Sequence, residues 1–202
     1  ASLSTYSAAS GSCALDGEGR TWCWGANPSG VGPSPMPVPG LVTDNPRLVT
    51  LATSSFWLCG LDAAGDAWCW GNSNASGQLG RGVVGGTGPF APAPVVGGLR
   101  FGRITAGWLH ACALTPQGAA WCWGLGLHGQ LGNGGSSNSA TPVPVSGGHT
   151  WASIVGGGVH TCGITTTGAA LCWGSNSGRQ LGRGQSGSSS TPVPVAGNIT
   201  WA

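Results

Sequence analysis

Eight cysteines, arranged as four equally spaced pairs, constrain the fold of this chain more than any other feature. The two cysteines of each pair are ten positions apart, and the first cysteines recur at intervals of 46, 53 and 50 residues. The pairs are Cys13 and Cys23, Cys59 and Cys69, Cys112 and Cys122, and Cys162 and Cys172. A period of this length is typical of propellers and solenoids. The sequence predicts one repeat domain over 1–202, with repeats at about 1–47, 48–100, 101–150 and 151–200, and with 201–202 beginning a further repeat.

Each cysteine pair brackets the signature of a β-hairpin. An apolar run follows the first cysteine, a polar turn ends in glycine (Gly19, Gly65, Gly118 and Gly168), and a second apolar run carries the second cysteine. If the strands pair symmetrically about the turn, the cysteines lie opposite one another, and the Cα atoms of a non-hydrogen-bonded antiparallel pair are about 4.5 Å apart. Because that separation is within disulfide range, we expect four local disulfides.

The tryptophans alternate with the second cysteine of the hairpin. Period-two alternation places Trp22 and Trp24 on one face of the strand and Cys23 on the other, and the second and third repeats have the same pattern. We therefore expect these tryptophans to form the packed layer.

A glycine-rich tail and a proline phrase follow each hairpin. The tail is clear at 77–80, 129–132 and 179–182 and is reduced to Gly30-Val-Gly32 in the first copy, and the proline phrases span 34–39, 91–95, 141–145 and 191–195. Proline cannot donate to a full ladder, so these phrases belong on edge strands or connections. The prediction is an all-β fold of four propeller-type blades with one disulfide per repeat.

The fourth copy, with His160-Thr-Cys-Gly-Ile and the phrase over 172–182, resembles the repeat of the regulator of chromosome condensation family. The resemblance implies blades of four antiparallel strands, conventionally seven to a ring. Four repeats are too few for seven blades, which leaves a segment of a longer protein, half of an assembled ring, or an open array. The nuclear nucleotide exchange and chromatin binding of the founding member are not implied, because oxidised cysteine pairs belong outside reducing compartments.

The end of the chain restarts the repeat. Trp201-Ala202 repeats the start of the phrase that begins at Trp151, and Ala1-Ser-Leu3 resembles the same strand. We expect residues near 196–202 to pair with a further repeat, a neighbouring chain or the N-terminal strand, because an unpaired strand would leave an open edge.

Charge excludes several classes of partner. Only 6% of the residues are charged, the net charge is +2, and the seven arginines are scattered along the chain. Nucleic-acid binding needs a stripe of positive charge, so we expect no nucleic-acid partner. No apolar run approaches the length of about eighteen residues that spans a bilayer, so we expect no membrane insertion.

His110 and His160 are candidate metal ligands, because each precedes a cysteine by two positions. The equivalent positions in the other repeats are Gly11 and Trp57, and close Cys-x-x-Cys pairs are absent, so disulfides are favoured and no metal or cofactor is expected.

Catalysis is also not indicated. Four of the five acids, Asp16, Glu18, Asp62 and Asp66, fall at predicted hairpin turns, where turn chemistry explains them, although paired carboxylates for glycoside cleavage stay an alternative. We expect no enzyme activity and no catalytic residue.

Glycosylation signals point outside the cell. Asn74-Ala-Ser76 and Asn198-Ile-Thr200 are N-glycosylation sequons, and the Ser-Pro, Ala-Pro and Thr-Pro phrases resemble glycosylated hydroxyproline motifs of plant and algal matrix proteins. Attached sugar would account for a soluble surface with so few charges. We predict an extracellular or cell-surface location with N- or O-linked glycans.

The leading hypothesis for function is an extracellular structural or adhesive module that self-associates or packs on neighbouring repeats, as in a glycosylated fibre or cell-surface layer. The alternative is a secreted protein- or glycan-binding propeller without catalysis, for which the segments 83–90 and 27–46 are the regions to inspect. Trp57, Trp108 and Trp151 could stack on sugars, but packing in the core or between blades is the favoured interpretation.

Overall fold

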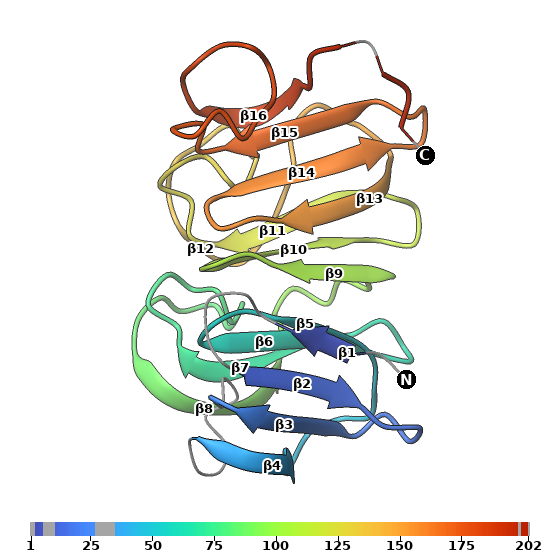
Figure 1. Cartoon of the computed structure of the whole chain (residues 1–202), viewed down its shortest axis with the longest axis vertical. Helices are drawn as coiled ribbons and strands as arrows, with labels where there is room; N and C mark the ends of the chain where they lie inside the picture. The colour runs from blue at the N-terminus through green and yellow to red at the C-terminus, as the bar shows by residue number, and fades with distance from the viewer. Residues whose placement is uncertain (1–2, 6–10, 27–34, 198, 202) are drawn as a thin grey trace.

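A computed structural model describes residues 3–5, 11–26, 35–197 and 199–201. These residues form four antiparallel sheets of four strands each and contain no helix (Figure 1). The first sheet consists of β1 (Leu3–Thr5), β2 (Gly11–Leu15), β3 (Thr21–Gly25) and β4 (Met36–Leu41). The second consists of β5 (Leu48–Thr53), β6 (Trp57–Asp62), β7 (Ala67–Ser73) and β8 (Thr87–Pro94). The third consists of β9 (Arg103–Ala106), β10 (His110–Leu114), β11 (Ala120–Gly124) and β12 (Ser139–Pro144). The fourth consists of β13 (Trp151–Gly156), β14 (His160–Thr165), β15 (Ala170–Gly174) and β16 (Ser189–Pro194).

Each sheet is one blade, and its strands follow one another in sequence order. The first strands of successive blades, β1, β5, β9 and β13, contact one another, and the proline-bearing strands β4, β8, β12 and β16 form the opposite edges. The prediction of four all-β propeller-type blades with one disulfide each is therefore confirmed. The assignment of the proline phrases to edge strands is confirmed as well.

The four disulfides join β-strands directly across each hairpin. Cys13 pairs with Cys23 in the register, and the same holds in the other three blades. The Cα atoms of the bonded cysteines are 4.0 to 4.1 Å apart. The glycine that ends the turn has a positive φ, for example 82° at Gly118, a conformation that glycine adopts without the steric cost of a Cβ.

The core lies between blades. Each of three apolar clusters combines the disulfide of one blade with a tryptophan from the next, and these buried indoles belong to Trp70, Trp123 and Trp173. The expectation that the hairpin tryptophans form the packed layer holds for Trp70 and Trp123, which are fully buried, and in part for Trp68 and Trp121, which pack against the core clusters. Trp22, Trp68 and Trp121 are only half-buried, whereas the cysteines on the other face are buried, because a neighbouring blade covers that face.

The blades are joined in one repeated register. The backbone N–H of Trp151, which starts the fourth blade, donates to the carbonyl oxygen of Gly118 in the turn of the third, and Leu48 and Phe101 make the equivalent bonds. Trp201 donates in the same way to Gly168 at 2.9 Å. Within the described residues, the C-terminal segment thus contacts the fourth blade, and β1 pairs with β2.

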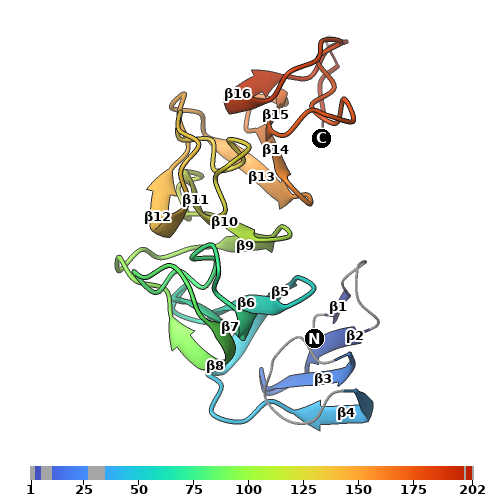
Figure 2. The same ribbon diagram turned by 90° about the vertical axis from the view of Figure 1, so that its left-hand side faces the viewer.

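The strands define two ends of the molecule. One end, here called the turn face, carries the turns between the second and third strands of each blade and the connections between blades. The other, the loop face, carries the loops between the first and second strands and between the third and fourth (left in Figure 1, toward the viewer in Figure 2).

Candidate binding surface

Two aromatic side chains are half-exposed on the loop face. Phe56, between β5 and β6, is 53% exposed, and Trp108, between β9 and β10, is 52% exposed. The same face exposes three aliphatic side chains in the loops between third and fourth strands: Val83, Val84 and Leu127. The turn face also exposes apolar side chains, at Val96, Ile199 and Trp201, but the loop face has two half-exposed aromatic side chains together with three aliphatic ones, which is typical of an interaction surface.

The backbone that carries Trp108 is held by both neighbouring blades. The hydroxyl of Ser54 and the indole N–H of Trp57 each donate to the carbonyl oxygen of Trp108 at 2.9 Å. The N–H of Trp108 donates to the carbonyl oxygen of Gly158 at 3.1 Å. Bonds to the second and fourth blades therefore fix the position from which the exposed indole projects.

The two sets of loops on this face are tied together in the second, third and fourth blades. The N–H of Asn72 donates to the carbonyl oxygen of Phe56 at 2.7 Å. Leu125 donates to Leu109, and Ser175 donates to Val159, in the corresponding places. A surface braced in this way loses little conformational freedom when a partner binds, which favours affinity.

The structure separates the three tryptophans that sequence reasoning considered for sugar stacking. Trp57 and Trp151 are buried, so they pack in the core as favoured, whereas Trp108 is exposed and core packing was the wrong interpretation for it. Sequence reasoning did not single out Phe56. Both exposed residues lie in short loops between apolar strands, where the repeat pattern alone does not distinguish core from surface.

His110 and His160 occupy equivalent positions at the start of their second strands, where His110 is fully buried and His160 is half-buried. The Nε2 atom of His110 lies 2.9 Å from the hydroxyl oxygen of Thr161, which itself donates to the carbonyl oxygen of Gln130. The shared hydroxyl must therefore accept from His110, which places the imidazole proton on Nε2. Burial, together with the nearby His160, lowers the pKa of His110 to about 3. In the part of the chain that the structure describes, no group of three or more His, Cys, Asp and Glu side chains could hold a metal ion.

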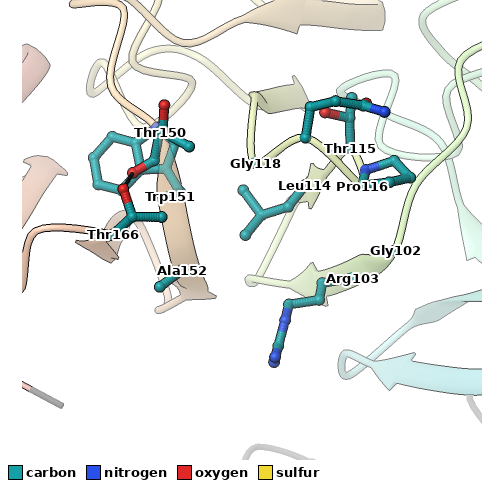
Figure 3. Close-up of a pocket in the computed structure, with 11 residues that line it drawn as sticks. Gly102, Arg103, Leu114, Thr115, Pro116, Gly118, Thr150, Trp151, Ala152 and Thr166 are labelled. Carbon is teal, nitrogen blue, oxygen red and sulfur yellow. Dashed lines mark hydrogen bonds between the residues drawn. The ribbon is translucent and has the colours of Figure 1, made fainter.

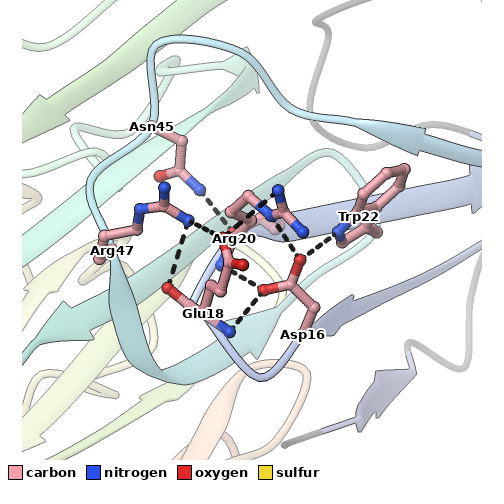
Figure 4. A network of polar contacts seen from close by, with 7 residues as sticks. Asp16, Glu18, Arg20, Trp22, Asn45 and Arg47 are labelled. Carbon is pink, nitrogen blue, oxygen red and sulfur yellow. Dashed lines mark hydrogen bonds and ion pairs between the residues drawn. The ribbon is translucent and has the colours of Figure 1, made fainter.

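All five carboxylates lie on the turn face. Asp16 accepts hydrogen bonds from the indole N–H of Trp22 at 2.9 Å and from the Nε of Arg20 at 2.6 Å (Figure 4). The Trp22 N–H, followed by Arg20, holds the pKa of Asp16 well below its usual range. Asp62 repeats the arrangement with Trp68 at 3.2 Å. Asp16 and Asp62 therefore serve their own turns, and the acids lie at the opposite end of the blades from His110 and His160; among the described residues no histidine forms an ion pair with a carboxylate.

A cavity of about 260 Å³ opens on the turn face between the third and fourth blades (Figure 3). Its lining includes Arg103, Leu114, Gln117, Thr150 and Thr166, with no carboxylate among its residues. Arg103, Gln117 and the two threonines can donate hydrogen bonds to a small polar molecule, but the lining includes no nucleophile paired with a base.

The sequon asparagine Asn74 is not an available glycan acceptor in this fold, so that prediction needs correction. Its side chain is 1% exposed, its amide donates to the carbonyl oxygen of Val83 at 3.0 Å, and its carbonyl accepts from the N–H of Leu79 at 3.1 Å. Asn176 makes the same two bonds, to Gln185 and from Leu181, so the residue type follows the structural repeat. Asn198 lies outside the described residues.

Four disulfide-clasped blades that pack through tryptophans define a segment of a β-propeller. Sequence models of the regulator of chromosome condensation (RCC1) repeat match residues 103–130, 151–180 and 117–164. Repeats of this family therefore make up residues 103–180 of the chain, and the first two blades share their fold.

Comparison with known proteins gives the same propeller fold. The RCC1 domain-containing protein RUG3, mitochondrial, of Arabidopsis thaliana is 42% identical over 67 residues, which are 33% of this chain and 15% of that protein. Human WBSCR16 superposes with a TM-score of 0.80 at 22% identity, over 95% of this chain and 52% of that one. Prp20p from Saccharomyces cerevisiae gives 0.77 at 22% identity, over 94% and 50%. The ectodomain of the Physcomitrella patens receptor kinase CR4 gives 0.58 at 29% identity, over 86% and 40%. The chain thus spans about half the length, or less, of these relatives. No helix in the described residues is long and apolar enough to cross a membrane.

Proposed function

We propose that this chain is a non-catalytic, extracellular protein-binding part of a propeller, which contacts its partner through the loop face. The observation that carries the proposal is the exposure of Phe56 and Trp108 from loops whose backbone is fixed by hydrogen bonds between blades. Aromatic side chains dominate the energetics of protein interfaces, and a rigid support increases what each contributes.

Two further observations support the proposal. Prp20p, which shares the fold, has been studied for its binding to Gsp1p and histones, so a related propeller binds proteins. Four disulfides and the likeness to a receptor ectodomain favour an oxidising, extracellular location.

The test compares two exposed tryptophans on opposite faces. A partner recovered from the extracellular proteins of the source is titrated against the wild type, Trp108→Ala and Trp201→Ala by calorimetry. We expect Trp108→Ala to weaken binding about tenfold or more. The matched control, Trp201→Ala, removes a side chain that is 42% exposed on the turn face and should change the affinity less than about twofold. Equal losses from both variants would rule out the loop face as the contact.

The second candidate is an extracellular structural or adhesive module that self-associates, with a second copy packing on the outer side of the fourth blade. In the internal interfaces, the carbonyl oxygens of Gln78 and Gln130 accept from the indoles of Trp123 and Trp173 in the next blade. The fourth blade keeps the corresponding residues, Gln180, Leu181 and Gly182. A second copy that offered an equivalent tryptophan could use this surface.

One residue argues against repetition of that packing. Gly77 and Gly129 allow the outer strand of the next blade to approach, since an added Cβ would lie 2.8 Å from the Cα of Ala140 and 2.6 Å from that of Ser190. Arg179 occupies the equivalent place in the fourth blade. Sedimentation velocity over a range of concentrations decides between the candidates: assembly requires concentration-dependent growth, and discrete monomers throughout would exclude it.

The outer strands also bear on glycan attachment. Thr141 and Thr191, each followed by proline, are exposed on β12 and β16. These are the positions where O-linked sugar could be attached without disturbing the core, and we propose them in place of Asn74. Intact mass before and after chemical deglycosylation of the secreted protein measures their occupancy.

A further inference from the structure

The charges of this protein are divided unequally between its two ends. Every charged side chain is among the described residues, so the comparison covers all of them. The loop face has three arginines in its loops, Arg81, Arg179 and Arg183, and no carboxylate. The turn face has the other four arginines and all five carboxylates. The net charge of +2 therefore divides into three positive charges on the loop face and one negative charge on the turn face.

Ion pairing increases this asymmetry. All four ion pairs found in the described residues lie on the turn face, where Arg20 and Arg47 pair with Asp16 or Glu18, and Arg100 pairs with Asp66. Two of the three arginines in the loops of the loop face use backbone carbonyls instead. Arg81 is half-buried and reaches back along its blade to donate to the carbonyl oxygens of Cys69 and Ala91, and Arg183 donates to those of Ser186 and Gly187. Carbonyl groups orient a guanidinium but leave its full positive charge in place.

Arg179 stands out among these residues because of its backbone. Its φ is 61°, in the left-handed region, and Gly77 and Gly129 fill the equivalent positions in the second and third blades. A residue with a Cβ is sterically strained in this conformation. A strained residue in place of glycine motivates a functional role for its side chain.

We infer that the loop face binds an acidic polypeptide segment that also carries apolar or aromatic side chains. This inference rests on the proposed function and adds the chemistry of the partner to it. The carboxylates of the partner would meet a face whose charged side chains are all positive. Its apolar groups would cover Phe56, Trp108 and the exposed aliphatic side chains. Three arginines do not form the positive stripe that nucleic acid requires. A polyuronate would supply negative charge, but it has no apolar side chains to cover the exposed valine and leucine side chains of the loop face.

The experiment uses random copolymers of defined charge. Binding of poly(Glu,Tyr) to the whole chain is measured by biolayer interferometry, with poly(Lys,Tyr) and polygalacturonate as comparison probes, at low and at high NaCl. We expect poly(Glu,Tyr) to bind, poly(Lys,Tyr) not to bind, and polygalacturonate to bind roughly tenfold more weakly than poly(Glu,Tyr). Binding of poly(Glu,Tyr) should weaken roughly tenfold at high salt, because salt screens exposed charges.

Two charge-reversal variants provide the matched comparison. Arg179→Asp introduces aspartate, which tolerates the left-handed region of φ. This variant should weaken poly(Glu,Tyr) binding roughly fivefold. Arg103→Asp makes the same change in net charge on the turn face and should have less than a twofold effect.

The outcomes separate this inference from the proposed function. Binding that is lost in Trp108→Ala but is insensitive to salt and to Arg179→Asp keeps the loop face and overturns the acidic partner. Equal losses in Arg179→Asp and Arg103→Asp show only an effect of net charge and overturn it as well. Stronger binding of polygalacturonate than of poly(Glu,Tyr) would replace the polypeptide with an acidic polysaccharide. Binding of poly(Glu,Tyr) that Trp108→Ala does not change would instead contradict the proposed function.

Discussion

The indole N–H of Trp173 in the fourth blade donates to the carbonyl oxygen of Gln130 in the third, at 2.9 Å. Trp123 makes the same bond to Gln78, at 3.0 Å, between the second and third blades. Both indoles are buried, as are the side chains of both glutamines. The Gly-Gln-Leu-Gly turn of one blade therefore receives the tryptophan of the next, and the repeat unit of sequence is also the unit of contact.

The first prediction concerns this contact. Trp123→Phe keeps an aromatic ring but leaves the carbonyl oxygen of Gln78 without its buried donor, so we expect the free energy of unfolding to fall by about 1 to 3 kcal/mol. Urea denaturation followed by circular dichroism measures the change. Trp108→Phe is the control. Because the indole of Trp108 is exposed, this substitution should lower the free energy of unfolding by less than about 0.5 kcal/mol. Equal effects of the two substitutions would show that the bond between blades contributes little.

The second prediction concerns the disulfides. Replacing Cys112 and Cys122 together with alanine opens a loop of about eleven residues, which should lower the free energy of unfolding by about 3 kcal/mol. The same replacement of Cys162 and Cys172 opens an equal loop, but these cysteines are less deeply buried.

We therefore expect the loss in the fourth blade to be smaller by about 1 kcal/mol, because less apolar contact disappears with the sulfur atoms. Urea midpoints of the two double variants under oxidising conditions make the comparison. A larger loss in the fourth blade would mean that burial is not what distinguishes the two disulfides.

Much of the fold could be predicted from the sequence because its constraints are local. The spacing of Cys112 and Cys122 fixes a hairpin register whatever the rest of the chain does, and proline restricts the last strand of each blade to an edge. The tryptophan layer was predicted only in part, because alternation tells which residues share a face, not how far a neighbour covers that face. In a blade both faces are covered, so Trp123 and Cys122 are both buried.

The candidate surface was only partly predictable. The sequence favoured core packing for Trp108, but the position of its backbone depends on hydrogen bonds with Ser54, Trp57 and Gly158, which are distant in sequence. The sequon at Asn74 shows the opposite case. A short motif signalled modification, while the position in the repeat required a buried amide.

The third prediction concerns the glycine that the repeat requires at its turn. Gly129→Ala places a Cβ 2.6 Å from the Cα of Ser190, at a φ of 80°, so both the clash and the backbone conformation oppose it. We expect a loss of about 2 kcal/mol or more in the free energy of unfolding. Arg179→Gly removes the side chain from the equivalent position and should stabilise the protein by up to about 1 kcal/mol. Thermal and urea unfolding of both variants should therefore shift in opposite directions, and shifts of the same sign would contradict the assigned strain.

The last prediction concerns stability in acid. His110 is buried, its Nε2 donates to Thr161, and its Nδ1 has no partner among the described residues, so a second proton on the ring would be left without an acceptor. Among the described residues, the one charged or titratable group that acts on His110 is His160, whose own pKa is also lowered by burial. Since the pKa of His110 falls from 6.5 in the unfolded chain to about 3 in the folded one, the unfolded chain binds more protons between these values.

Stability is therefore lost as the pH falls from about 6.5 towards 3, and His110 contributes a slope of about 1.4 kcal/mol per pH unit. His110→Gln removes the titrating group, so its free energy of unfolding should depend less steeply on pH between about pH 4 and 6, by roughly that amount. Trp123→Phe, which weakens the same region without removing a titrating group, should keep the wild-type slope. Urea titrations at several pH values measure all three slopes, and parallel slopes for the wild type and His110→Gln would mean that His110 is not held neutral by the fold.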